Sequence, residues 1–263
     1  MKPFKSKIAI VIVLIIGLLQ FSACSSSQVT ESQSSSTKDA SSQSAESQKS
    51  LISEETPEVD NEIVPELEPV LPVTLTDAVG NTITITSVER IIPLDGSVAE
   101  VVFALNLGAN VVATDRSATW PPEASELPQI GYQRSLLAEP IAGFTPTVLI
   151  GTEIAGPEKT LDDLRRLGYP VVIVPSEANM QGPAEKIRAV AEALGVPNRG
   201  EELASRMEKT IVSNTQVFEE DIRPVVAALY IRGTGTQLVL GRNSATHWLI
   251  NAAGGKNVAD ILD

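Results

Sequence analysis

Four short apolar runs between residues 91 and 174 constrain the fold of this chain more than any other feature. The runs predict strands at Ile91–Leu94, Asn110–Thr114, Thr147–Gly151 and Val171–Val174. Between them, apolar residues recur at helical spacing, namely Val98, Val101, Val102 and Leu105, then Leu161, Leu164 and Leu167. Short apolar strands that alternate with amphipathic helices predict a parallel, doubly wound α/β sheet.

A hairpin is predicted before this sheet and two helices after it. Val73–Thr76 and Thr82–Thr86 alternate apolar and polar side chains on either side of a short turn, which is a hairpin signal. After Val174, two helical patterns follow one another without an intervening strand. The second extends from about Asn198 to Glu219, so it spans roughly 33 Å at 1.5 Å per residue and is long enough to bridge two lobes.

A second lobe is predicted to begin after Pro224. The pattern indicates strands at Val225–Ile231 and Gln237–Leu240 and a helix at Ala245–Ala253. These elements are too few to close a sheet and a core by themselves. We therefore expect residues 223–263 to be a truncated C-terminal lobe, with the rest of that lobe lying beyond Asp263.

The N-terminal residues have the layout of an export signal. A short basic segment is followed by an apolar run at residues 8–19 and by small residues before Cys24. The run is shorter than the roughly 20 residues of a membrane-spanning helix. The segment resembles a bacterial lipoprotein signal, which implies that Cys24 is lipidated and holds the protein at the extracellular face of the cell membrane. An uncleaved anchor with an incidental cysteine is the alternative.

The segment that follows Cys24 is predicted to be a disordered tether. It is rich in Ser, then in Glu and Pro, and contains too few apolar residues to offset the entropy of an ordered chain. The predicted organisation is a lipoprotein signal peptide at 1–23, a tether at 24–72, an N-terminal α/β lobe at 73–178, connecting helices at 179–222 and a partial C-terminal α/β lobe at 223–263.

Composition excludes several classes of function. The formal net charge of −13, which is densest in the tether, argues against binding to nucleic acid, which requires clustered cations. One Cys excludes an internal disulfide framework, and one His with that Cys excludes a Cys/His zinc cage. The chain contains no G-x-S-x-G elbow, no Walker A loop, and no G-x-G-x-x-G between a strand and a helix. We therefore predict that the protein is not an enzyme and has no catalytic cofactor.

A set of motifs extends over about residues 74–263. The motifs are Ile91–Glu100, Asp115–Pro121, Leu127–Tyr132, Pro146–Pro157, Leu229–Gly233 and Ala252–Gly255. Together they resemble the haem-binding proteins of bacterial ABC importers, those of the HmuT type. The resemblance implies a periplasmic-binding-protein-like fold, in which one long helix joins two α/β lobes and the ligand lies between them.

The resemblance also implies two iron ligands. Tyr132 matches the N-lobe ligand, although the most similar branch of the family often has His there, and Tyr230 matches the C-lobe ligand. Arg232 corresponds to the arginine that hydrogen-bonds to the C-lobe ligand. Phenolate oxygen favours ferric iron, and residues 230 and 232 point to the same side of a strand. His247 matches no ligand position of the family, and Tyr169 is expected to be structural.

Further residues are candidates for supporting the haem or for docking. Backbone N–H groups at Gly96 and Ser97 begin a predicted helix, where anions such as haem propionates are attracted. Arg116 and Arg134 are further candidates for binding the propionates. Trp120 either covers the porphyrin face or fills the loop between a strand and a helix. Glu139 resembles the N-lobe glutamate that docks on the permease.

The sequence therefore predicts a monomeric, lipid-anchored receptor that captures haem and delivers it to an ABC permease driven by its ATPase. Haem is expected as the transported ligand. One alternative is the same fold binding a ferric siderophore or cobalamin. Another is an anchored sensor or interaction domain without transport. A secreted enzyme is a third, and the missing catalytic motifs oppose it.

Overall fold

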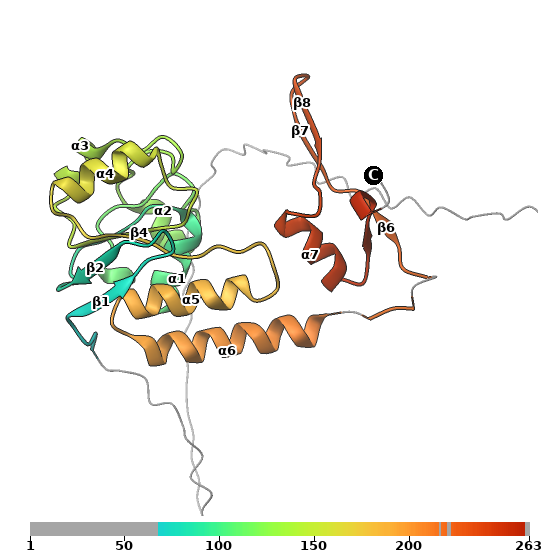
Figure 1. Ribbon diagram of the computed structural model, residues 1–263, viewed down its shortest axis with the longest axis horizontal. Coiled ribbons are helices and arrows are strands. Elements are labelled where there is room, and N and C mark those ends of the chain that lie inside the picture. Colours follow the sequence, from blue (N-terminus) through green and yellow to red (C-terminus); the bar gives the residue numbers. More distant parts are fainter. Residues whose placement is uncertain (1–67, 216, 220–221, 261–263) are drawn as a thin grey trace, which may run out of the picture. The chain divides into compact units, whose positions relative to one another are not determined.

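The computed structural model describes residues 68–215, 217–219 and 222–260 (Figure 1). The predicted signal peptide, Cys24 and nearly all of the predicted tether lie outside the described residues. Every described element belongs to one compact unit of the chain, Glu62–Asp263. Within the described residues, none of the helices has the length and apolar character needed to cross a membrane.

The predicted hairpin is present. Strand β1 (Val73–Thr76) pairs antiparallel with β2 (Thr82–Ile85), and Leu75 lies opposite Ile83. The turn is held by Asp77, whose Oδ1 accepts hydrogen bonds from the N–H groups of Val79 and Asn81 at 3.2 and 2.7 Å. An Asp that bonds to backbone groups two and four residues later is a standard way of stabilising such a turn.

A three-stranded parallel sheet forms the centre of residues 68–215, in the order β3 (Ile91–Pro93), β4 (Val148–Gly151) and β5 (Val171–Ile173). Ile92 lies opposite Leu149, and Ile150 opposite Val172. All three strands are buried throughout, which explains their continuous apolar runs. The predicted α/β class is confirmed.

The prediction of a complete strand at Asn110–Thr114 is wrong. The segment forms two isolated parallel bridges, from Val111 to Ile91 and from Thr114 to Gln129. Because the segment changes its pairing partner within four residues, it does not build a continuous ladder. It nevertheless lies beside β3 on the side opposite β4, as a short fourth strand would.

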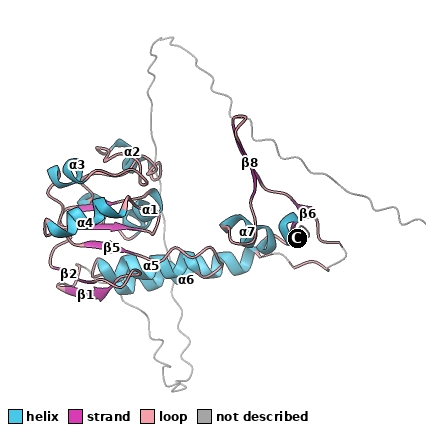
Figure 2. Ribbon diagram, turned by 45° about the horizontal axis from the view of Figure 1, so that its top comes forward, coloured by secondary structure: helices cyan, strands magenta, loops and turns pink. Residues whose placement is uncertain are grey.

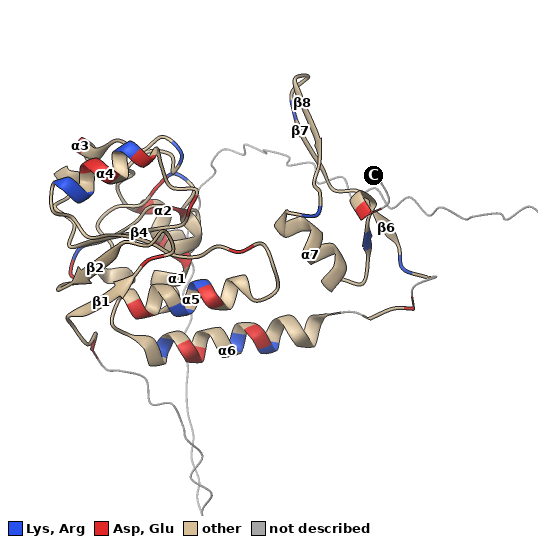
Figure 3. Ribbon diagram, viewed as in Figure 1, with Lys and Arg blue, Asp and Glu red and all other residues tan. Residues whose placement is uncertain are grey.

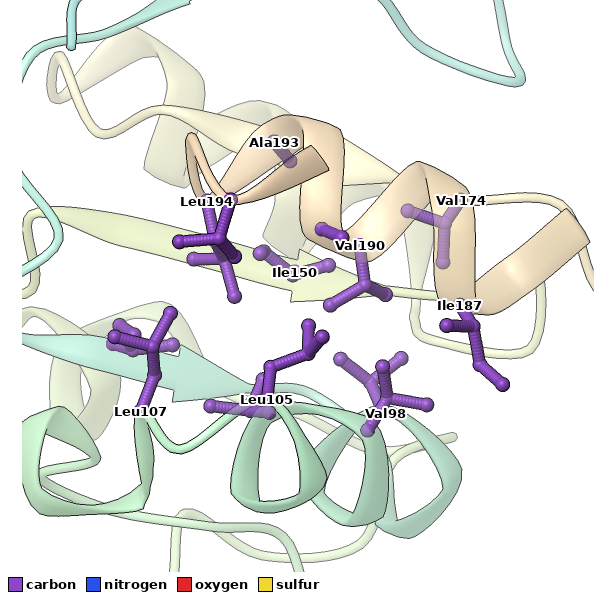
Figure 4. Close-up of a cluster of buried hydrophobic side chains, with 14 of the residues drawn as sticks. Val98, Leu105, Leu107, Ile150, Val174, Ile187, Val190, Ala193 and Leu194 are labelled. Carbon is purple, nitrogen blue, oxygen red and sulfur yellow. The ribbon is translucent and has the colours of Figure 1, made fainter. Parts of the chain in front are cut away.

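Helices cover both faces of the sheet (Figures 1 and 2). On one face lie α1 (Gly96–Ala104) and α5 (Gly182–Ala193), and on the other lie α3 (Ala138–Gly143) and α4 (Glu158–Arg166). Figure 4 shows the first core cluster, in which Val98 and Leu105 face Ile187 and Val190 across Ile150. Short elements that were not predicted complete this part, namely η1 (Gly108–Asn110) and α2 (Pro122–Glu126).

Helix α6 (Pro197–Asn214) packs along α5. Gly200 permits the contact, since a Cβ there would lie 2.2 Å from Ala191 Cβ. Arg188 of α5 also pairs with Glu201 and Glu208 of α6 at 2.7 and 2.8 Å. Both helices carry acidic as well as basic residues (Figure 3). The long helix predicted from about Asn198 to Glu219 is present, but it ends at Asn214, five residues earlier than predicted.

The C-terminal segment contains β6 (Val225–Val226), β7 (Leu229–Arg232), β8 (Thr236–Val239) and α7 (Ala245–Ala252), followed by β9 (Lys256–Asn257) and η2 (Val258–Asp260). Strand β6 pairs parallel with β9, whereas β7 pairs antiparallel with β8. The single strand predicted at Val225–Ile231 is thus wrong, because residues 227 and 228 interrupt it and its two halves have different partners.

Candidate ligand-binding site

The polar residues of the N-terminal lobe gather at one edge of the parallel sheet. From β3 the chain crosses to the 111–114 segment on one side, and later returns to β4 on the other side. The carboxyl ends of β3 and of the 111–114 segment therefore flank a topological switch point, where open α/β sheets place their ligands. The loops that leave this point contain Asp95–Ser97 and Asp115–Ser117.

Asp95 forms the floor of this switch point. Its side chain is only 1% exposed. Oδ1 accepts hydrogen bonds from Ser97 Oγ at 2.7 Å and from Val98 N–H at 3.1 Å, which caps the N-terminus of α1. Oδ2 accepts from both the N–H and the hydroxyl of Thr152, at 2.9 and 3.0 Å. One carboxylate therefore joins the start of α1 to the end of β4.

Asp115 repeats this arrangement on the other side of the switch point. It is fully buried, and Ser117 donates to it from its hydroxyl at 2.8 Å and from its N–H at 3.0 Å. Burial raises the pKa of the Asp115 carboxyl, and the nearby charge of Asp95 raises it further, while the bonds from Ser117 oppose the shift. Two buried carboxylates thus lie close together beneath the site.

Gly96 is needed for the close approach of these two loops. A Cβ at this position would lie 2.4 Å from the carbonyl oxygen of Ser117. The N–H of Gly96 donates to Ser117 Oγ at 2.9 Å. The Gly96 amide, a predicted propionate donor, therefore has a partner within the protein.

A loop at residues 131–136 crosses the same edge of the sheet. The N–H of Arg116 donates to the carbonyl of Gly131 at 2.7 Å, and the N–H of Gly156 donates to the carbonyl of Gln133 at 2.8 Å. The loop is therefore attached to the 115–118 loop at one end and to the loop after β4 at the other. Within it, Tyr132 points outward with 43% of its surface exposed, whereas Gln133 points inward and is only 8% exposed.

These loops enclose a polar crevice at the N-terminus of α1. It is lined by Asp95, Gly96, Ser97, Glu100, Ser117, Gln133 and Ile154. Its volume of about 240 Å³ lies below the roughly 300–1,000 Å³ typical of pockets that enclose a whole small ligand. The crevice therefore fits one edge or one substituent of a larger ligand.

An apolar groove adjoins the crevice and shares Ser97 and Glu100 with it. Its volume is about 300 Å³, and its walls come from α1, α5, α6 and the loop that carries Trp120. The apolar lining residues are Val101, Ala104, Trp120, Pro183, Ile187, Leu203 and Met207. Lys186 also lines the groove and donates a hydrogen bond to Ser97 Oγ at 3.0 Å. A ligand with an apolar body and a polar edge would match the lining of this pair of hollows.

The structure brings together only some of the predicted site residues. Gly96 and Ser97 line the crevice, and Trp120, 62% exposed, lines the groove. Tyr132 and Arg134 lie on the adjacent loop with exposed side chains and line neither hollow. Arg116 is likewise exposed, and the predicted docking residue Glu139 lies exposed in the first turn of α3.

Tyr230 and Arg232 lie on the exposed strand β7. Tyr230 is 46% exposed and faces Leu238 across the hairpin, and Arg232 pairs with Thr236 two residues further along. Their spacing places both side chains on the same face of the strand. His247 lies within α7, with Nε2 at 3.1 Å from the side-chain amide nitrogen of Asn251 and Nδ1 at 3.8 Å from Asp260.

Three residues of the site, Asp95, Asp115 and Gln133, were not predicted. For the two acids a signal was available, because each follows the end of an apolar run and is followed two residues later by Ser, in Asp95-Gly96-Ser97 and Asp115-Arg116-Ser117. An Asp directly before a helix is a common N-cap. No local pattern distinguishes Gln133 from any other loop glutamine.

Comparison with known proteins agrees with the fold. The model of a family described as periplasmic binding protein matches residues 91–262. The heme-binding protein RhuT from Roseiflexus sp. RS-1, in its apo form, is 45% identical, with a TM-score of 0.63 over 66% of this chain and 68% of RhuT. The heme-binding protein HmuT is 30% identical, with a TM-score of 0.64 over 76% of this chain and 66% of HmuT.

Curated sequence relatives include a vitamin B12-binding protein from Vibrio parahaemolyticus, 26% identical over 117 residues. The match covers 44% of this chain and 42% of that relative, so the chain matches less than half the length of this relative. The proteins found in these comparisons are binding proteins rather than enzymes. The resemblance inferred from the sequence motifs is thereby confirmed.

Proposed function

Since the chain belongs to the periplasmic binding protein family, we propose that it is a haem receptor that delivers its ligand to an ABC importer. One observation carries the proposal: an apolar groove adjoins a polar crevice at the switch point of a lobe similar to heme-binding RhuT. The groove suits a flat apolar macrocycle, and the adjacent crevice suits a polar substituent. Lipidation at Cys24, which would hold the receptor at the cell surface, is part of the same proposal.

Tyr132 and Tyr230 are the proposed iron ligands, one from each lobe. Both residues are partly exposed, which supports their assignment as ligands. A phenolate is a hard anionic donor suited to ferric iron, and bound iron favours the deprotonated form. Arg232, on the same face of β7 as Tyr230, is proposed to stabilise that phenolate.

The remaining contacts are assigned by charge and position. Arg116 and Arg134, on neighbouring exposed loops, are the proposed partners of ionised propionates. Trp120 is proposed to pack against the porphyrin in the apolar groove. Glu139, exposed on α3, is proposed to dock on the permease, and the receptor is proposed to act as a monomer.

Titration of hemin into the purified protein tests the proposal. Stoichiometric binding should shift the Soret band, and tyrosine ligation should add a charge-transfer band that is lost in Tyr132→Phe or Tyr230→Phe. Tyr169→Phe is the matched control, because Tyr169 is partly buried and its hydroxyl lies 3.4 Å from the carbonyl of Ala142. Absence of any Soret shift would refute haem binding, whereas a shift unchanged in both variants would refute only the ligand assignment.

Vitamin B12 is the second candidate ligand, favoured by the curated relatives. A corrin ring is also a large macrocycle, but its cobalt does not require two tyrosine ligands. Parallel titration with cyanocobalamin distinguishes the two candidates. Binding of cyanocobalamin without binding of hemin would replace the haem proposal.

A further inference from the structure

Lys186 brings a positive charge to the place where the apolar groove meets the polar crevice. Among the described residues that line the two hollows, it alone is basic. It lies on α5, is partly exposed, and donates a hydrogen bond from Nζ to Ser97 Oγ at 3.0 Å. Ser97 lines both hollows, so this bond holds the ammonium group at their junction.

The ammonium group keeps donors for a ligand. Among the described residues, Ser97 is its one hydrogen-bond partner, and no Asp or Glu forms an ion pair with it. An ammonium group has three N–H donors, so two of them remain. Lys159 on α4 shows the contrast, because its ammonium pairs with the carboxylate of Asp163 at 2.8 Å.

The residues beneath Lys186 fix its position before a ligand binds. Ser97 Oγ donates to the buried carboxylate of Asp95 at 2.7 Å, which leaves the serine oxygen to accept from Lys186. A chain of hydrogen bonds therefore connects the exposed ammonium to the floor of the crevice. A lysine that is already held in place loses less side-chain freedom on binding than one that is not.

The charges around the two hollows place an anion at this junction rather than inside the crevice. Asp95 and Asp115 lie buried beneath the crevice, and like charges at short range disfavour an ionised group there. Glu100 lines both hollows, but it is exposed, so solvent and salt screen its charge. A carboxylate that comes from the groove reaches Lys186 at the mouth of the crevice.

We infer that Lys186 is a specificity-determining residue, whose ammonium group binds an ionised carboxylate on the edge of the macrocycle that lies in the groove. The inference rests on the proposed function and deepens it. With haem, one propionate pairs with Lys186 in its ordinary ionised form, and the other is left for Arg116 or Arg134. A macrocycle with a neutral edge, such as the amide-bearing corrin of cobalamin, gains no ion pair from Lys186.

Hemin and its dimethyl ester test the inference, because the two ligands share the ring and the iron but only hemin carries carboxylates. Lys186→Met removes the ammonium group and keeps an unbranched apolar stem in the groove. This substitution should weaken the binding of hemin about fivefold in the Soret titration, as expected for a partly exposed ion pair. The affinity for the diester should stay the same, so the preference for hemin over the diester should fall by the same factor.

Lys209→Met is the matched control, because Lys209 is exposed on α6 and lines neither hollow. It removes the same charge and should retain the wild-type preference. An unchanged ratio of hemin to diester affinity in Lys186→Met, or an equal decrease in Lys209→Met, would overturn the inference while hemin binding continued to support the proposed function. Failure of hemin itself to bind the wild type would overturn both.

Discussion

Replacing Asp95 with Ala should destabilise the N-terminal lobe more than any nearby surface change. The carboxylate accepts four hydrogen bonds, from Ser97, Val98 and two groups of Thr152. Loss of the N-cap of α1 costs about 1 kcal/mol. The two Thr152 donors are buried, and each donor left without an acceptor costs about 1–3 kcal/mol.

One effect opposes this loss. The charge of Asp95 helps to raise the pKa of Asp115, so its removal relieves a repulsion between two buried carboxylates. At the effective dielectric constant of about 20 that applies even to buried sites in proteins, two charges at short range interact by a few kcal/mol at most. We therefore expect a net loss of about 3 kcal/mol, which corresponds to a decrease of roughly 6–12 °C in the unfolding temperature for a domain of this size.

Thermal unfolding followed by far-UV circular dichroism at pH 7 measures the effect. Asp95→Asn keeps a single carbonyl oxygen and can satisfy either the helix cap or Thr152, so about half the loss is expected. Glu100→Ala is the control, because Glu100 is exposed on the same helix and surface substitutions change stability by about 0.5 kcal/mol or less. If Asp95→Ala unfolds at the same temperature as Glu100→Ala, Asp95 does not hold the two loops together.

Three further predictions concern α5, α6 and the groove. The hydrogen bond from Arg188 lowers the pKa of Glu201 to about 2. This pair therefore stabilises the fold fully above the ordinary carboxyl pKa, and the stabilisation is lost as the pH falls toward 2. Arg188→Gln should lower the free energy of unfolding in urea by about 0.5–1 kcal/mol at pH 7, and the difference from the wild type should shrink below about pH 4.5. Gly200→Ala should destabilise by about 1–3 kcal/mol in thermal unfolding despite its better helix propensity, because its Cβ would overlap Ala191. Trp120→Ala should weaken hemin binding about fivefold in the Soret titration while leaving the unfolding temperature nearly unchanged.

The fold class could be predicted because apolar periodicity reports burial directly. The strands β3, β4 and β5 are buried throughout, and their apolar runs marked them within one or two residues. The segment 110–114 carries the same apolar signal, since Val111 and Ala113 are buried. Its failure to form a continuous strand depends on the pairing of Thr114 with Gln129, which no local pattern specifies.

The candidate site was less predictable for the same reason. The sequence placed Gly96 and Ser97 at a helix start, and the structure places them there. It did not show that Ser117, twenty-one residues later, supplies the acceptor for the Gly96 amide. Which groups remain free to bind a ligand depends on such long-range hydrogen bonds, whereas sequence motifs report only which groups are present.

The two Asp–Ser turns determine how this lobe is prepared for a ligand. Each turn follows the end of an apolar segment at the switch point and satisfies its own carboxylate with a serine hydroxyl and a backbone N–H. The floor of the crevice therefore keeps its hydrogen bonds without any ligand and does not have to be ordered on binding.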